Sequence, residues 1–165
     1  MREPPAHAVQ DFYPDDFSHC YGCGRLNAHG LQLKTRWEGE DTVARFQPAP
    51  EHMALPGYVY GGLIASLIDC HAMGTAAAAT LRAEGRDVGD APSPRFVTAA
   101  LRVDYLKPTP LGPELEIRAR VRERTPRKVV VESTVSAGGV ITARGEAVAV
   151  PMPAGMAGVE RGAIP

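Results

Sequence analysis

The chain of 165 residues lacks several features that would place it in a specialised class of protein. Its formal net charge is −1, which argues against a nucleic-acid binder held by bulk positive charge. No run of apolar residues reaches the length of about 20 that a membrane-spanning helix needs. We therefore expect neither nucleic acid nor a membrane as a partner.

Cysteine is also scarce, with three residues in the chain. An odd number of cysteines cannot all pair within one chain. The N-terminal segment, MREPP, is polar and broken by proline, unlike a secretory signal peptide. We therefore expect reduced thiols and a cytoplasmic location.

Apolar residues, by contrast, make up 44% of the chain, as is typical of a globular protein. A length of 165 residues suits one domain with a sizeable core. Composition divides the chain into an irregular N-terminal arm over residues 1–19, a domain over residues 20–150, and a tail over residues 151–165. The tail is rich in glycine and proline, and we expect it to be flexible.

Alternating apolar and polar residues predict strands on both sides of one helix. The predicted strands are residues 31–37, 42–46, 96–106, 114–123, 128–137 and 140–150. The helix runs from Leu63 to about Ala83 and is apolar nearly all round, so it should be buried. Gly85 is a plausible C-cap.

This order of elements predicts an α+β fold. A curled antiparallel sheet of five to six strands would surround one long central helix. Part of the helix surface and one sheet edge would remain uncovered. We therefore expect a homo-oligomer, either a dimer or a dimer of dimers.

The turn before the helix is the most informative feature. It ends in Gly61-Gly62, and Asp69 follows two turns into the helix. A helix N-terminus offers unpaired N–H groups and a positive dipole end, which favour negative charge. A lone carboxylate on an apolar helix is costly unless something pairs with it or uses it. The segment predicts a functional site, with a tight turn and a carboxylate paired to a partner subunit as the alternative.

Three motifs carry a resemblance to a known family. They are CYGCG at 20–24 with Asn27 and Gly30-Leu31, PGxxYGG at 56–62 with Asp69, and FVTAALRVDYLKPTPLG at 96–112. In this order the chain resembles the hot-dog fold acyl-CoA thioesterases, in particular the PaaI-like branch of the 4-hydroxybenzoyl-CoA thioesterase superfamily. The resemblance covers roughly residues 20–150. It implies hydrolysis of acyl-CoA thioesters to free acid and CoA, without a cofactor.

The resemblance also implies catalytic roles for three residues. Asp69 would act as general base on water or as a nucleophile that forms a mixed anhydride, and both options stay open. The Gly62 N–H would donate a hydrogen bond to the thioester carbonyl oxygen. Thr98 matches a site threonine that positions water or supports Asp69 from the neighbouring subunit.

Four further residues are implied in substrate binding: Tyr60, Gly61, Arg127 and Lys128. The family usually has histidine where Tyr60 stands. A tyrosine hydroxyl can replace it if the histidine orients the glycine loop, whereas activity would be weakened or redirected if the histidine positions water or substrate. Arg127 and Lys128 lie in a turn where related enzymes contact the nucleotide end of CoA, although such a turn is most often merely solvated. The alternative function is a hot-dog module that binds acyl-CoA or another small ligand without turnover.

The three cysteines and His71 are expected to have structural roles. Cys20 and Cys23 have the spacing of a zinc knuckle, but no second pair of cysteines follows and the resembling family requires no metal, so no metal site is expected. Cys70 is expected to pack. His71 lies about 200° round the helix from Asp69 and should be a core or interface histidine. Hydratase chemistry, which needs an Asp and a His close together, is therefore disfavoured.

Overall fold

A computed structural model describes residues 7–156. The first six residues of the predicted arm and the last nine of the predicted tail lie outside the described residues. The predicted flexibility of the tail therefore stays a prediction for residues 157–165.

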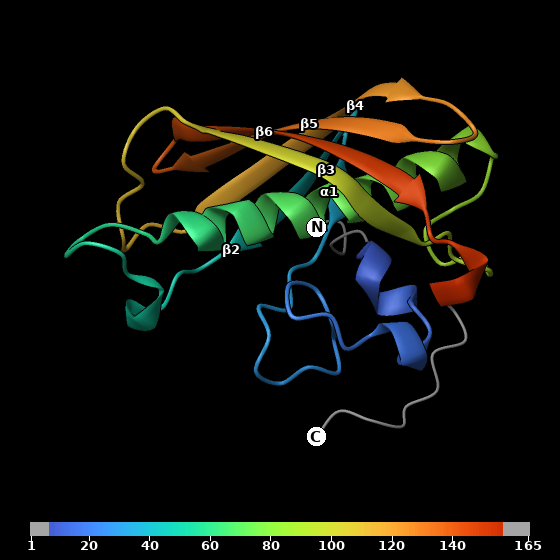
Figure 1. Ribbon diagram of the computed structural model, residues 1–165, viewed down its shortest axis with the longest axis horizontal. Helices are drawn as coiled ribbons and strands as arrows, with labels where there is room; N and C mark the ends of the chain where they lie inside the picture. Colours follow the sequence, from blue (N-terminus) through green and yellow to red (C-terminus); the bar gives the residue numbers. More distant parts are fainter. Residues whose placement is uncertain (1–6, 157–165) are drawn as a thin grey trace, which may run out of the picture.

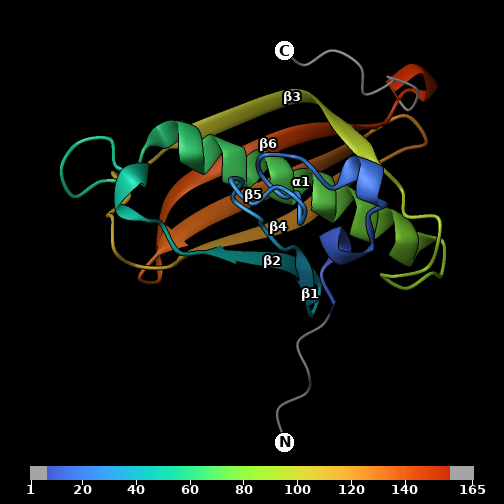
Figure 2. The ribbon, with the colours of Figure 1, turned by 90° about the horizontal axis from the view of Figure 1, so that it is seen from below.

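One antiparallel sheet and one long helix form the body of the molecule (Figure 1). The sheet has the strand order β1-β2-β4-β5-β6-β3. Its strands are β1 (Arg36–Glu38), β2 (Asp41–Phe46), β3 (Phe96–Tyr105), β4 (Leu115–Arg124), β5 (Val129–Ala137) and β6 (Val140–Pro151). The helix, α1 (Gly61–Ala83), lies across the inner face of the sheet (Figure 2). The predicted α+β architecture is confirmed.

The first predicted strand is the main error in the expected elements. Residues 31–35 are not part of the sheet, and β1 begins at Arg36. Gln32 has a φ of 50°, which interrupts an extended strand. The flanking N–H groups of Leu31 and Leu33 donate to the carbonyl groups of Tyr21 and Gly22 instead of to a strand.

The buried face of α1 explains why the helix is apolar. Leu63, Ile64, Leu67 and Ile68 pack against residues from β2, β4, β5 and β6 in the larger core cluster. By length and composition α1 is long and apolar enough to cross a membrane, contrary to our expectation that no such segment exists. Most of this helix is buried inside the fold, and a buried core helix can have the same length and composition as a membrane-spanning one.

The N-terminal arm covers the far half of α1. Two short 3₁₀ helices, η1 (Val9–Phe12) and η2 (Asp15–Phe17), lie beneath the helix on the side opposite the sheet (Figure 1). Val9 and Tyr13 pack against Ala77 and Ala78, which are buried. The alanine run at 76–79 is therefore a face of close approach.

The two edges of the sheet differ. β1 has three residues, whereas β3 has ten and its burial pattern is largely exposed. A register shift lies between Thr98 and Ala100, so Ala99 is an extra residue in a β-bulge. The four β3 residues that pair with buried positions of β6 are Thr98, Leu101, Val103 and Tyr105. Val97 pairs with half-buried Val150 on the outer face, so the simple alternation predicted for this strand is wrong before the bulge.

Candidate functional site

Asp69 lies half-buried on the side of α1 that borders β3. The Thr98 hydroxyl donates a hydrogen bond of 2.5 Å to Asp69 Oδ1. Both residues belong to the same chain, so Thr98 supports Asp69 from within the subunit and not from a neighbouring one. The bond leaves the second carboxylate oxygen of Asp69 available to a water or a substrate.

The glycine turn forms the N-terminus of α1, with Tyr60 as the N-cap. Tyr60 makes no side-chain capping bond, and its carbonyl oxygen accepts from the N–H groups of Leu63 and Ile64. Within residues 7–156, no backbone acceptor is recorded for the N–H of Gly61 or Gly62. These two donors belong to the first turn of a helix, where the dipole favours negative charge.

The ring of Tyr60 lies directly against Gly62. A Cβ atom built on Gly62 would stand 2.4 Å from Tyr60 Cε1, so this position admits only glycine while the ring keeps its place. Tyr60 is itself 58% exposed. Its ring packing, and not a hydrogen bond from its hydroxyl, is what it contributes to the turn in this structure.

The hydroxyl that does hold the glycine turn belongs to Tyr105, which the sequence did not single out. Tyr105 Oη donates a hydrogen bond of 2.7 Å to the carbonyl oxygen of Gly61. Burial raises the pKa of Tyr105 above its ordinary value, so the hydroxyl stays protonated as a donor. Only the pairing of β3 with β6, which sets the face of Tyr105, could have identified this contact.

Gly62 and Asp69 of one chain are too far apart to act on one carbonyl group. Seven residues of helix separate them, which is a rise of about 10 Å along the axis. A reacting atom has to lie about 3 Å from both the donor and the nucleophile or base. If both groups act on a thioester, each needs a complement from elsewhere, and we refer to them as the two candidate half-sites.

Arg127 and Lys128 lie in the turn between β4 and β5. Their backbone N–H groups both donate 3.2 Å hydrogen bonds to Thr125 Oγ1, and Lys128 Nζ lies 3.2 Å from a carboxylate oxygen of Glu123. Val129, which follows them, pairs with Ala149, and Ala149 pairs with Thr98. The turn is thus at the same end of the sheet as Thr98, two strands or about 10 Å across.

His71 is a satisfied core residue, as expected. It is completely buried, with Nδ1 3.0 Å from Thr35 Oγ1 and Nε2 3.4 Å from Thr42 Oγ1. Burial lowers its pKa to about 4, so the ring is neutral near pH 7. It lies away from Asp69 and is not part of the candidate site.

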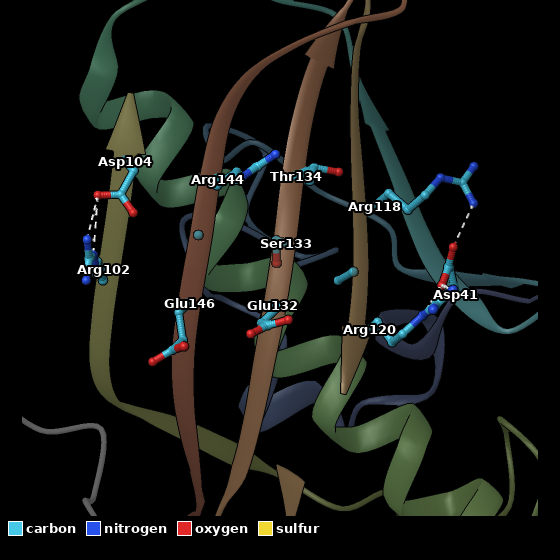
Figure 3. Close-up of a pocket in the computed structure, with 12 residues that line it drawn as sticks. Asp41, Arg102, Asp104, Arg118, Arg120, Glu132, Ser133, Thr134, Arg144 and Glu146 are labelled. Carbon is cyan, nitrogen blue, oxygen red and sulfur yellow. Dashed lines mark hydrogen bonds and ion pairs between the residues drawn. The ribbon is translucent and has the colours of Figure 1, made fainter. Parts of the chain in front are cut away.

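One cavity adjoins the candidate site and another lies away from it. A cavity of about 380 Å³ adjoins the glycine turn, lined by Tyr60, Gly62 and Ser66 with residues of the preceding loop. Another, of about 630 Å³, lies on the outer face of the sheet (Figure 3). Its side chains carry both signs of charge and pair with one another, for example Arg102 with Asp104 and Arg118 with Asp41. Because the sheet separates it from α1, we assign it no part in the chemistry of Asp69.

Comparison with known proteins gives the family. The family model of the thioesterase superfamily matches residues 56–143, which include the glycine turn, Asp69 and β3. A crystal structure of a thioesterase superfamily protein from Shewanella loihica PV-4 is 52% identical, with a TM-score of 0.65, and the match covers 84% of this chain and 98% of that one.

Two further relatives are more distant. The acyl-coenzyme A thioesterase THEM4 of Xenopus laevis is 37% identical over 87 residues, which are 53% of this chain and 33% of that protein. The chain thus matches about a third of the length of this curated relative. The Escherichia coli PaaI protein from the phenylacetic acid degradation operon shares the fold at 15% identity, with a TM-score of 0.60 over 74% of this chain and 81% of that one. The predicted hot-dog fold is confirmed, and the chain belongs to the thioesterase superfamily.

Proposed function

We propose that this protein hydrolyses acyl-CoA thioesters at a site shared by two copies of the chain. One observation carries the proposal: Asp69, held by Thr98, lies on a half-exposed helix face beside an unpaired edge strand, about 10 Å from the helix N-terminus of its own chain. Membership of the thioesterase superfamily and the partial match to an acyl-coenzyme A thioesterase support thioester chemistry.

The edge strand β3 offers the contact between copies. It has ten residues, it lies at one end of the strand order, and it carries exposed Leu101 and Tyr105. A long apolar edge strand left open is a template for pairing with another chain. A two-fold axis perpendicular to β3, which would pair two copies of this strand in antiparallel fashion, would bring the Asp69 half-site of one copy towards the Gly62 half-site of the other.

The chemistry would divide between these half-sites. The Gly62 N–H, with the dipole of α1 behind it, donates to the thioester carbonyl oxygen as negative charge develops there, and one such donor in a preorganised site contributes roughly 3–4 kcal/mol. Asp69 either removes a proton from the attacking water or attacks the carbonyl carbon itself. Thr98 fixes the Asp69 carboxylate and leaves Oδ2 to act.

The CoA end would lie towards the β4–β5 turn. Arg127 and Lys128 suit phosphate by fork geometry and as a point charge respectively. Their turn lies at the same end of the sheet as Thr98. Lys128 would have to exchange its Glu123 partner for phosphate.

One variant pair tests the reaction. Asp69→Asn keeps the size of the side chain and a partner for Thr98, and we expect it to lower thiol release from acyl-CoA substrates by about 10²–10⁴-fold. Asp104→Asn is the matched control, because Asp104 lies on the outer face of β3 and pairs with Arg102. Equal turnover in both variants would contradict the assignment.

A mixing experiment tests the sharing between chains. Asp69→Asn and Gly62→Ala chains, each weakly active alone, are unfolded together and refolded as a mixture. If the site is shared, half of the dimers are mixed, each with one intact site, and about a quarter of wild-type turnover returns. No recovery means that both groups act within one chain.

The second candidate is a module that binds acyl-CoA without turnover. The Tyr60 ring favours it, since this ring stands where the family usually has histidine and packs directly against Gly62. Stoichiometric CoA binding without thiol release across short, long and aryl acyl-CoA thioesters would support this function and replace the first.

A further inference from the structure

The three cysteines of the chain meet in one place. Cys20 and Cys23 lie in the loop after the N-terminal arm, and Cys70 lies on α1 directly after Asp69. Their sulfur atoms lie within 4.8 Å of one another, and Cys20 Sγ is 3.7 Å from Cys70 Sγ. A metal was not expected from the sequence because no second cysteine pair follows the first. The fold supplies a third cysteine from the helix.

We propose that Cys20, Cys23 and Cys70 form a binding site for one thiophilic divalent cation of the Zn²⁺ class, with a fourth position left to water. Thiolates bound to zinc at about 2.3 Å in a tetrahedron stand about 3.8 Å from one another. The distance between Cys20 Sγ and Cys70 Sγ, 3.7 Å, is close to this value. It is far longer than the bond of about 2.05 Å in a disulfide.

Glycine residues in the loop make the cluster possible. A Cβ atom on Gly22 would stand 2.2 Å from Cys70 Sγ, so any side chain here would displace that sulfur. A Cβ atom on Gly24 would stand 2.5 Å from the backbone nitrogen of Cys20 and prevent the tight turn. The turn is closed by the Gly24 N–H, which donates to the Cys20 carbonyl oxygen at 2.8 Å.

The three sulfur atoms differ in their access to solvent. Cys23 is buried, Cys70 is half-buried and Cys20 is exposed, so an ion would enter from the Cys20 side.

A bound ion would join two distant parts of the chain. It would tie the loop at residues 20–24 to the middle of α1, at the residue after Asp69. Binding releases a proton to solvent from each thiol that is still protonated, and no electron is transferred.

Direct metal binding tests the proposal. The full chain, reduced and stripped of metal under anaerobic conditions, is titrated with Zn²⁺ and with Co²⁺. We expect one ion per chain, thiolate-to-cobalt charge-transfer bands together with the visible bands of tetrahedral Co²⁺, and protection of all three thiols from alkylation by Zn²⁺. Cys70→Ser should weaken Zn²⁺ binding at least about 100-fold, since even outer-sphere changes cost 10–100-fold.

A glycine pair gives a matched control. Gly22→Ala places a methyl group against Cys70 Sγ and should weaken binding at least about tenfold. Gly155→Ala meets nothing within 4 Å and should leave binding unchanged. Circular dichroism and thermal unfolding establish whether each variant is folded. If a variant does not fold, protection of the three thiols by Zn²⁺ in the wild-type protein still tests the site.

Three outcomes would overturn the site. They are the absence of stoichiometric Zn²⁺ binding to the reduced wild type, equal affinity in the wild type and a folded Cys70→Ser, and alkylation of all three thiols at the same rate with and without Zn²⁺. None of these readouts depends on thioester hydrolysis, so the metal site and the proposed function fail separately.

Discussion

The two sides of α1 differ in how completely their groups are satisfied. On the buried side, Ile68 and Ala72 pack against the sheet, and the one ionisable group, His71, finds both of its partners within the fold. The open side carries Gly62, Asp69 and Cys70, and each of these has bonding capacity left over. One helix thus packs into the core on one side and presents groups with unused bonding capacity on the other.

Truncation at Ile68 should give the largest contrast between the two sides. Ile68 is fully buried, and Ile68→Ala should lower the free energy of unfolding by about 3–4 kcal/mol through lost burial and a cavity. Its neighbour Asp69 is half-buried beside the β3 edge, so Asp69→Asn should change that free energy by less than about 1 kcal/mol. Urea unfolding of both variants makes the measurement. Similar losses would mean that Asp69 is a structural residue and not a free reactive group.

A fall in pH should have the next largest effect on stability, through His71 on the buried side of α1. The folded pKa of His71 is about 4, below its ordinary value of 6.5, so the unfolded chain binds the proton more readily. The stability from neutral His71 is fully present above about pH 6.5 and is lost as the pH falls towards 4, a change of about 3 kcal/mol.

Unfolding by urea at several pH values measures this loss. His71→Gln should flatten the slope between pH 6.5 and 4, whatever its absolute stability. His29→Gln, at an exposed position, should keep the wild-type slope. A His71→Gln slope equal to that of the wild type would show that other groups cause the pH dependence.

Thr98 should give the smallest effect, and on activity more than on stability. Thr98→Val keeps the shape of the side chain and removes the hydrogen bond that holds Asp69 Oδ1. We expect turnover to fall about tenfold, which corresponds to about 1.4 kcal/mol of transition-state stabilisation. Thr98→Ser should restore most of the activity because it keeps the hydroxyl. Turnover of Thr98→Val at the wild-type level would remove Thr98 from the site.

Much of the fold follows from local patterns. The helix, five of the six strands and the buried position of His71 were predicted, because apolar periodicity and glycine or proline turns report directly on the local backbone. Residues 31–35 were assigned wrongly because the N–H groups of Leu31 and Leu33 donate to a loop at residues 21–22 and that of Thr35 donates to the N-terminal arm, contacts that alternation does not encode.

The candidate site was only partly predictable from the sequence. Asp69, Gly62 and Thr98 were named through a family resemblance, and the structure brings Asp69 and Thr98 into contact. Tyr105 and the third cysteine of the cluster were missed. Both depend on tertiary pairing: Tyr105 reaches Gly61 through the register of β3, and Cys70 meets Cys20 from 50 residues away.

The bulge at Ala99 decides the parity of β3. Thr98 and Tyr105 are seven positions apart, an odd number, so a regular strand would direct them to opposite faces of the sheet. Both nevertheless reach α1, one at Asp69 and the other at Gly61. The single extra residue converts an odd interval into an even one. The extra residue Ala99 thus allows the same strand to contact the helix both at Asp69 and at the glycine turn.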